Sequence, residues 1–272
     1  MNAPVESGLD AALEVGPAGL LPRLAAGPAA ALRSSRRFGR TSMFLVDFAH
    51  HVRRELRALP DDAASTLRRQ GSMAFAAENL CVLSGFATNA RGPLPEGPAI
   101  LMCNHVSWQD PLLVANVVPA IPVAKREVGE WPMVGDLARG LDVLLVDRAS
   151  AHSGARVLLR ARELLARGAS ILTFPEGTTT TGEDILPLRR GMFGVAAQMD
   201  VPVIPIALRY RHADASWVGD ANFLPHYLET VARPQTIAEL SFGAPLHAEA
   251  GEAPEAFAER TRAVMRALLR QR

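Results

Sequence analysis

A histidine and an aspartate, His105 and Asp110, stand five positions apart directly after an apolar run that is typical of a buried strand. Histidine can take a proton from a hydroxyl near neutral pH, and a carboxylate bonded to its other ring nitrogen would fix the tautomer. The pair therefore predicts general-base activation of a hydroxyl, which can belong to a substrate. The spacing alone is also compatible with a surface histidine followed by an aspartate that caps a helix.

A second candidate is Glu176, which follows the apolar run 170–174 and precedes a turn rich in glycine and threonine. A carboxylate at a strand end, beside a hydroxyl-rich loop, suits the binding of a polyol or a head group. The alternative is a polar loop whose threonines satisfy backbone groups.

Basic residues end two further predicted strands: Lys125 closes the run 121–125, and Arg148 follows the run 143–147. In parallel sheets ligands collect beyond the carboxyl ends of the strands, where cations suit a phosphate or carboxylate. Each cation alone could be a solvated surface charge. Because His105 and Glu176 also stand at strand ends, the four residues together favour a single site.

The elements that would position these residues follow an α/β pattern. Short apolar runs predict strands at 98–103, 121–125, 143–147, 170–174, 202–209 and 237–242. The clearest helices are predicted at 154–167 and 254–272. Alternating strands and helices imply crossover connections, so we expect a largely parallel central sheet flanked by helices, over residues 86–272.

The N-terminal part has a different pattern. Residues 1–40 are rich in alanine, glycine and proline and predict a loose arm. Residues 41–85 predict a pair of amphipathic helices, the second broken near Gly71. Residues 20–60 carry eight arginines, so the pair is either a helical cap on the domain or lies on a membrane surface with arginines at anionic head groups.

Composition argues against several classes of protein. A net charge of +1 gives no indication of a nucleic-acid partner. The two cysteines argue against a disulfide framework and have no metal-ligand spacing, so no metal site is predicted. No run approaches the roughly 20 apolar residues of a membrane-spanning helix, and no secretory signal is expected.

Four ordered blocks resemble those of the glycerolipid acyltransferases, whose best-known bacterial members are the 1-acylglycerol-3-phosphate acyltransferases. The blocks are Asn104-His105-x4-Asp110, then 143–148, 174–178 and 201–206. The resemblance covers about residues 75–245, and the spacing between the first two blocks also fits at Lys125, Glu127, Pro132 and Gly135.

The resemblance implies that His105 is the general base and that Asp110 orients it. The hydroxyl of a lysolipid would attack the thioester of acyl-CoA or acyl-carrier protein directly, with no acyl-enzyme and no cofactor. Arg148 and Glu176 would bind the acceptor, and Lys125 would lie near its head group. The remaining substrate-binding candidates in the blocks are Asn104, Gly177 and Thr178.

Members of this family work at a membrane, often through an N-terminal helix pair. The resemblance therefore implies that residues 41–85 bind the membrane surface, as part of a peripheral enzyme on the cytoplasmic face of the inner (plasma) membrane. The strand at 201–206 would help to build the acyl-binding core.

Two positions depart from the family pattern. Asp142 stands where the second block commonly has glycine, and Thr179 stands where the third block often has an arginine that is associated with the acceptor phosphate. Arg189 or Arg190 could substitute for that arginine. The loop at 178–182 and the stretches 186–188 and 217–220 are similar to the lyso-ornithine lipid acyltransferase branch.

The first expectation for function is acyl transfer to 1-acylglycerol-3-phosphate, with lyso-ornithine lipid as the alternative acceptor. A thioester hydrolase could use the same pair with water in place of the lysolipid hydroxyl. A catalytically silent membrane-surface protein is a third possibility, and the intact His105 and Asp110 count against it.

Overall fold

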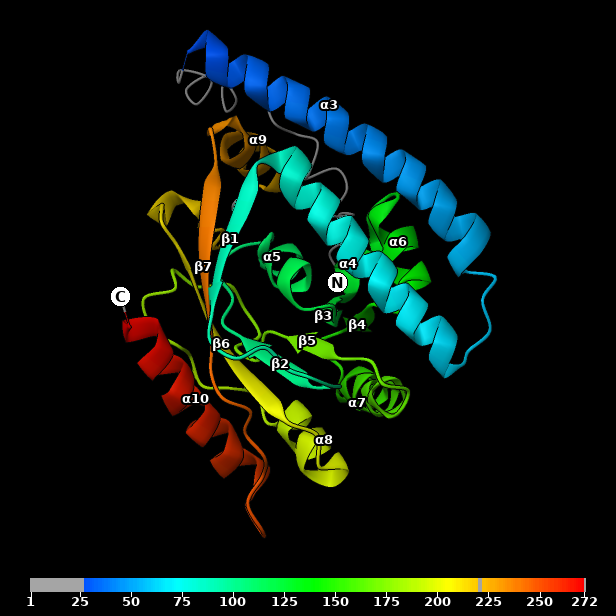
Figure 1. The fold of residues 1–272 in the computed structure, drawn as a ribbon, viewed down its shortest axis with the longest axis vertical. Helices are drawn as coiled ribbons and strands as arrows, with labels where there is room; N and C mark the ends of the chain where they lie inside the picture. The colour runs from blue at the N-terminus through cyan, green and yellow to red at the C-terminus, as the bar shows by residue number, and fades with distance from the viewer. Residues whose placement is uncertain (1–26, 220–221, 272) are drawn as a thin grey trace, which may run out of the picture.

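The computed structural model describes residues 27–219 and 222–271 of the chain. A seven-stranded sheet lies at its centre, in the order β1-β7-β6-β2-β5-β3-β4. The five strands from β6 to β4 run parallel to one another, whereas β7 is antiparallel to β6 and β1 follows the direction of β7. The predicted α/β class with a largely parallel sheet is confirmed (Figure 1).

The strands overlap the six predicted runs and add one that was missed. They are β1 (Phe86–Arg91), β2 (Ile100–Cys103), β3 (Ile121–Lys125), β4 (Leu144–Val146), β5 (Ile171–Thr173), β6 (Val203–Tyr210) and β7 (Thr236–Phe242). The missed strand is β1, in which only the first residue is buried. Its sequence has no run of apolar side chains, and it pairs with β7 through its backbone.

Helices cover both faces of the sheet (Figure 1). One face carries α4 (Ala63–Ser84), α5 (Asp110–Val117) and α9 (Phe223–Ala232), and the other carries α7 (Ala151–Ala166), α8 (Gly191–Met199) and α10 (Pro254–Arg270). A 3-10 turn, η3 (Arg126–Glu130), and the short helix α6 (Val134–Gly140) join β3 to β4.

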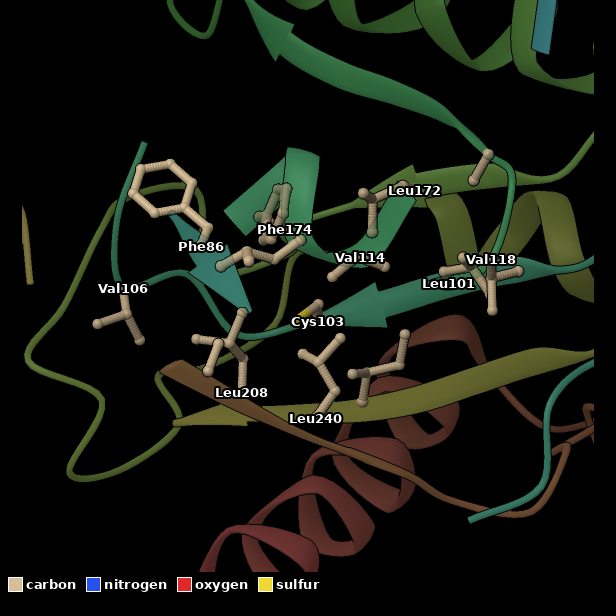
Figure 2. Close-up of a cluster of buried hydrophobic side chains, with 14 of the residues drawn as sticks. Phe86, Leu101, Cys103, Val106, Val114, Val118, Leu172, Phe174, Leu208 and Leu240 are labelled. Carbon is tan, nitrogen blue, oxygen red and sulfur yellow. The ribbon is translucent and has the colours of Figure 1, made fainter. Parts of the chain in front are cut away.

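An apolar core fills the layer between the sheet and α5. Leu101, Leu172, Leu208 and Leu240 come from four different strands and are fully buried. Figure 2 shows them gathered with side chains of α5 on the face of the sheet opposite α10. Burying a leucine contributes about 1.5–3 kcal/mol, so this layer fixes the carboxyl ends of the strands that carry the site.

The N-terminal hairpin is longer than the sequence predicted. Its first helix, α3, runs from Pro28 to His51 and continues through a π-helical turn, η2 (Val52–Leu56), before the chain turns back into α4. The prediction of a loose arm is therefore wrong for residues 28–40, whereas residues 1–26 lie outside the described residues. The predicted break near Gly71 is also wrong, because α4 is continuous there.

The hairpin packs on the domain through apolar side chains. Phe48, Val52, Leu56 and Met73 form a buried cluster with residues of α6. Asp62 caps α4 by accepting a hydrogen bond of 2.8 Å from the backbone N–H of Ser65. Within the described part of the chain, no helix combines the length and the apolar character needed to cross a membrane.

Candidate active site

His105 lies two residues beyond the end of β2, in a turn that leads into α5. The turn brings Asp110, the first residue of α5, back to the imidazole: Asp110 Oδ2 lies 2.8 Å from His105 Nδ1. The same oxygen accepts hydrogen bonds from the backbone N–H groups of Val106, at 2.6 Å, and Ser107, at 2.8 Å. The Asp110 carboxylate therefore both stabilises the turn and orients the His105 ring.

Tyr210, the last residue of β6, completes the surroundings of this carboxylate. Its hydroxyl donates to Asp110 Oδ1 at 2.5 Å. Burial, together with the neighbouring Asp110 charge, raises the pKa of Tyr210 well above its ordinary value, so the phenol stays protonated and keeps donating. The sequence analysis missed this residue because the predicted strand stopped at residue 209, one position short of it.

The His105 ring stacks on Phe174, with ring centroids 4.2 Å apart. Its side chain is 16% exposed, whereas that of Asp110 is fully buried. Asp110 occupies Nδ1, and no other described residue hydrogen-bonds to Nε2. Nε2 is therefore the atom that can accept a proton from an incoming hydroxyl.

Glu176 holds the other side of the histidine turn. Its Oε1 accepts from the backbone N–H of His105 at 2.9 Å, and its Oε2 accepts from the N–H of Leu186 at 3.0 Å. Burial raises the pKa of Glu176, and these two hydrogen bonds oppose the rise. The backbone N–H of Thr180 donates to His105 O at 2.8 Å. The loop after β5 therefore hydrogen-bonds to both the backbone N–H and the backbone C=O of His105. The Glu176 carboxylate thus binds the protein's own backbone.

Asn104 joins the ends of two strands. It is fully buried, its Nδ2 donates to Leu208 O at 3.0 Å, and its Oδ1 accepts from Leu208 N at 2.7 Å. Both polar atoms of the Asn104 side chain therefore hydrogen-bond to the backbone of β6. These bonds fix the backbone position immediately before His105.

The two predicted cations lie farther along the same edge of the sheet. β2, β5, β3 and β4 are successive neighbours, and the exposed Lys125 ends β3 while the half-buried Arg148 follows β4. Neighbouring strands are about 4.8 Å apart, so Arg148 lies three strands away from β2, the strand that leads to His105. No hydrogen bond or ion pair among the described residues joins either cation to His105.

The remaining predicted residues form the loop after Glu176. Gly177 has a left-handed φ of 74°, which glycine adopts readily, and an added Cβ there would lie 2.4 Å from Arg189 Nε. Thr178 is exposed.

Across the described ranges, no group of three or more His, Cys, Asp or Glu side chains is arranged to hold a metal ion.

Comparisons with known proteins identify the family of this chain. Residues 87–209 match the family model described as Acyltransferase. A lyso-ornithine lipid O-acyltransferase from Pseudomonas aeruginosa is 34% identical over 200 residues, which cover 72% of this chain and 76% of that relative. The chain belongs to the acyltransferase family. The predicted family and enzyme class are therefore confirmed, and the protein is an acyltransferase.

Two further acyltransferases are similar to this one. A 1-acyl-sn-glycerol-3-phosphate acyltransferase from Neisseria gonorrhoeae is 32% identical over 120 residues, which cover 43% of this chain and 47% of the relative. The crystal structure of a 1-acyl-sn-glycerophosphate acyltransferase from Thermotoga maritima matches with a TM-score of 0.66, over 88% of this chain and 93% of that one. At 17% identity, that likeness establishes the shared fold.

Proposed function

We propose that this acyltransferase moves a fatty acyl group from an acyl thioester to the free hydroxyl of a lysolipid, with His105 as general base and Asp110 as its orienting residue. The observation that carries the proposal is the bonding of Asp110. Its buried carboxylate accepts from two backbone N–H groups and the Tyr210 hydroxyl, and it contacts His105 Nδ1, which leaves Nε2 for the substrate.

The reaction then needs only one covalent step. His105 Nε2 takes the proton of the lysolipid hydroxyl as its oxygen attacks the thioester carbonyl carbon. The carbon–sulfur bond breaks, and the imidazolium returns the proton to the departing thiolate of CoA or acyl-carrier protein. The negative charge of Asp110 stabilises the imidazolium in between, and no cofactor or acyl-enzyme takes part.

Lyso-ornithine lipid is the acceptor that the observations favour. The Pseudomonas aeruginosa relative, of which the match covers 76%, is named a lyso-ornithine lipid O-acyltransferase. In addition, Thr179 stands where the third block of the family often has an arginine that is associated with an acceptor phosphate. The first expectation from sequence, 1-acylglycerol-3-phosphate, stays as the second candidate because the Neisseria relative carries its name. A labelled acyl donor offered with both lysolipids in parallel, with products resolved by mass, distinguishes the two.

Replacing the base tests the mechanism. The variant His105→Ala should lose acyl transfer by about 10²–10⁴-fold, because a positioned general base contributes about that much. Circular dichroism and thermal unfolding should show that the variant is folded. Near-normal transfer by the folded variant would refute the mechanism, and free fatty acid as the sole product of the unaltered protein would indicate a hydrolase.

The hairpin is the part of the molecule that would meet the membrane, at the cytoplasmic face of the inner membrane. Met43 on α3 and Val82 on α4 are 70% and 72% exposed, although both are apolar. Exposed arginines that make no ion pair with a described residue accompany them: Arg36, Arg40, Arg54 and Arg68. Apolar side chains beside cations suit a surface of anionic lipid.

Vesicle sedimentation tests this part of the proposal. The double variant M43Q/V82Q should bind anionic vesicles several-fold more weakly, because each apolar side chain contributes when it enters the acyl region. Leu159 on α7 is 59% exposed and lies on the other face of the sheet, so Leu159→Gln is the matched control. Equal binding by the double variant and the control would contradict the assignment of the hairpin.

A further inference from the structure

We propose that His226 of α9 is a positioning residue for acyl transfer, which accepts a hydrogen bond from Trp108 and so holds the turn that carries the base. The inference rests on the proposed reaction, in which His105 is that base. Trp108 lies inside the turn, between His105 and Asp110, whereas His226 lies 118 positions farther along the chain than Trp108. The fold therefore makes a contact to which the spacing of the four family blocks gives no clue.

The two ring nitrogens of His226 face groups of opposite kind. Trp108 Nε1 lies 3.1 Å from His226 Nδ1, and an indole N–H can only donate a hydrogen bond. The backbone oxygen of Ser216 lies 3.1 Å from His226 Nε2, and a carbonyl oxygen can only accept one. These two groups select the neutral imidazole with its proton on Nε2, so Nδ1 is the atom that accepts from Trp108.

α9 also packs against the ring of Trp108. The ring centroid of Phe223 lies 5.1 Å from that of Trp108, and Phe86 of β1 packs on the same indole at 5.8 Å. Phe223 and His226 are three residues apart in the helix, so they lie on one face. A single face of α9 thus supplies both a ring contact and the buried hydrogen-bond acceptor for Trp108.

The loop before α9 holds the same turn at its backbone. The backbone N–H of Trp217 donates to Val106 O at 2.9 Å. The residue before it, Ser216, is the one whose carbonyl oxygen accepts from His226 Nε2. The imidazole of His226 therefore connects two contacts with the turn, one to the Trp108 side chain and one to the loop that holds Val106.

A displacement of this turn would reach the base through its backbone. Asp110 Oδ2 accepts from the N–H groups of Val106 and Ser107 and contacts His105 Nδ1, so a shift of the turn moves the carboxylate and the imidazole together. A general base must lie within hydrogen-bond reach of the proton that it takes. A misplacement of about 1 Å can lower the rate about 100-fold, and His226 is placed to prevent such a shift.

Two substitutions at position 226 separate the two hydrogen bonds of the imidazole. In His226→Asn the amide oxygen can take the place of Nδ1 and accept from Trp108. In His226→Gln the amide nitrogen can take the place of Nε2 and donate to Ser216 O. We expect His226→Gln to lower kcat about tenfold, less than a full 1 Å misplacement, with both KM values unchanged. His226→Asn should keep most of the kcat, because it keeps the bond to Trp108.

Thr230→Val is the matched control for stability. Thr230 is buried on α9, and its Oγ1 donates to His226 O at 2.7 Å. The variant therefore removes a buried hydrogen bond from the same helix and leaves the imidazole in place. Urea unfolding should show a loss of stability in both Thr230→Val and His226→Gln, whereas kcat should fall only in His226→Gln. Equal kcat values for His226→Asn and His226→Gln, or a lower value for His226→Asn, would overturn the inference.

Trp108→Phe tests the donor of the same hydrogen bond. It keeps an aromatic ring in the turn and removes the indole N–H, so its kcat should fall about as far as that of His226→Gln. Because both variants remove one bond, the double variant Trp108→Phe/His226→Gln should have nearly the kcat of either single variant. Two losses that multiply in the double variant would show that Trp108 and His226 act separately, which also overturns the inference.

NMR of the indole N–H groups separates the bond from the proposed reaction, because it needs no turnover. The chain has three tryptophans, and the Trp108 signal is the one that is missing from Trp108→Phe. This signal should move in His226→Gln and stay near its original position in His226→Asn. If it moves as expected while His105→Ala transfers acyl groups normally, the proposed base is wrong and the bond stands. An unmoved signal in His226→Gln, in a protein whose transfer depends on His105, would overturn the inference and leave the reaction standing.

Discussion

The His105 site and the α3–α4 hairpin differ in the polar contacts that hold them in place. At the site, bonds converge on Asp110, whose side chain is fully buried and contacts two backbone N–H groups, a tyrosine and a histidine. The hairpin meets the domain through a buried apolar cluster, through largely buried contacts such as the ion pair of Arg69 with Asp142, and through exposed ion pairs, such as those of Asp61 with Arg160 and Arg167. Asp61 is 58% exposed.

This difference separates the contacts that fix the geometry of the site from the contacts that attach the hairpin to the domain. Buried hydrogen bonds are costly to break and are little affected by salt, so they fix the base to within the tolerance that proton transfer needs. Exposed ion pairs contribute about 0–1 kcal/mol each and are screened by salt. The exposed contacts of the hairpin can therefore change without moving His105, and three substitutions test how far the two regions are independent.

The largest effect should come from Asp110→Asn. An amide group there would turn an N–H toward the N–H groups of Val106 and Ser107 or toward the Tyr210 hydroxyl, and it would carry no charge to stabilise the imidazolium. We expect kcat to fall about 10²–10⁴-fold, as for loss of general-base catalysis. Steady-state kinetics measure this, with Asp136→Asn as the control because Asp136 pairs with Arg53 on the surface.

An activity within tenfold of the unaltered protein would show that the orientation of His105 does not depend on the Asp110 charge. Unfolding in urea must accompany the kinetics, because the same substitution leaves a donor without a partner in the core and costs about 1–3 kcal/mol.

A smaller effect should follow from Tyr210→Phe. The change removes the hydroxyl that donates to Asp110 Oδ1 and leaves this buried oxygen without a partner, so the free energy of unfolding should fall by about 1–3 kcal/mol. We expect kcat to fall about tenfold with both KM values unchanged, because Tyr210 acts on the base through Asp110 and touches no substrate. Tyr227→Phe is the matched control, since Tyr227 is a buried tyrosine of α9 that contacts Phe38 of α3. Loss of stability with an unchanged kcat would show that Tyr210 serves packing alone.

Elements with a distinct apolar pattern could be predicted from the sequence, and elements held by backbone or long-range contacts could not. The run 121–125 became β3 with the same bounds, because a short, mostly apolar run that ends at charged residues suits a parallel strand. β1 was missed because its pairing with β7 depends on backbone contacts between residues far apart in the chain.

The same division holds within the site. His105 and Asp110 are close in sequence and their pairing was predictable, whereas the bond from Tyr210 spans one hundred positions. The role of Glu176 could not be read from its type, because a carboxylate at a strand end suits a ligand as well as the two backbone N–H groups it binds. Asp142 replaces a common glycine at a left-handed φ of 59°, which Asp tolerates, and its carboxylate pairs with Arg69 and Arg160.

The smallest effect should come from Asp61→Asn, which removes an exposed anchor between the hairpin and α7. Arg167 and Arg160 lower the pKa of Asp61 by hydrogen bonding to it, so the folded state binds this proton less readily than the unfolded chain does. A lowered pKa contributes stability above the unfolded value of about 3.9, and that contribution is lost as the pH falls toward the folded value. Because Asp61 is largely exposed, we expect a loss of at most about 1 kcal/mol at pH 7 and low salt.

Urea unfolding at two salt concentrations and two pH values measures the difference in the free energy of unfolding between the unaltered protein and Asp61→Asn. It should shrink at high salt, because exposed pairs are screened, and it should also shrink as the pH falls below about 4, because Asp61 of the unfolded chain then binds a proton that the folded state binds less readily. Asp47→Asn is the control, since Asp47 is exposed on α3 and makes no ion pair with a described residue. A loss larger than that of Tyr210→Phe, or a loss that salt leaves unchanged, would contradict the division between the buried bonds that fix the site and the exposed ion pairs that help to attach the hairpin.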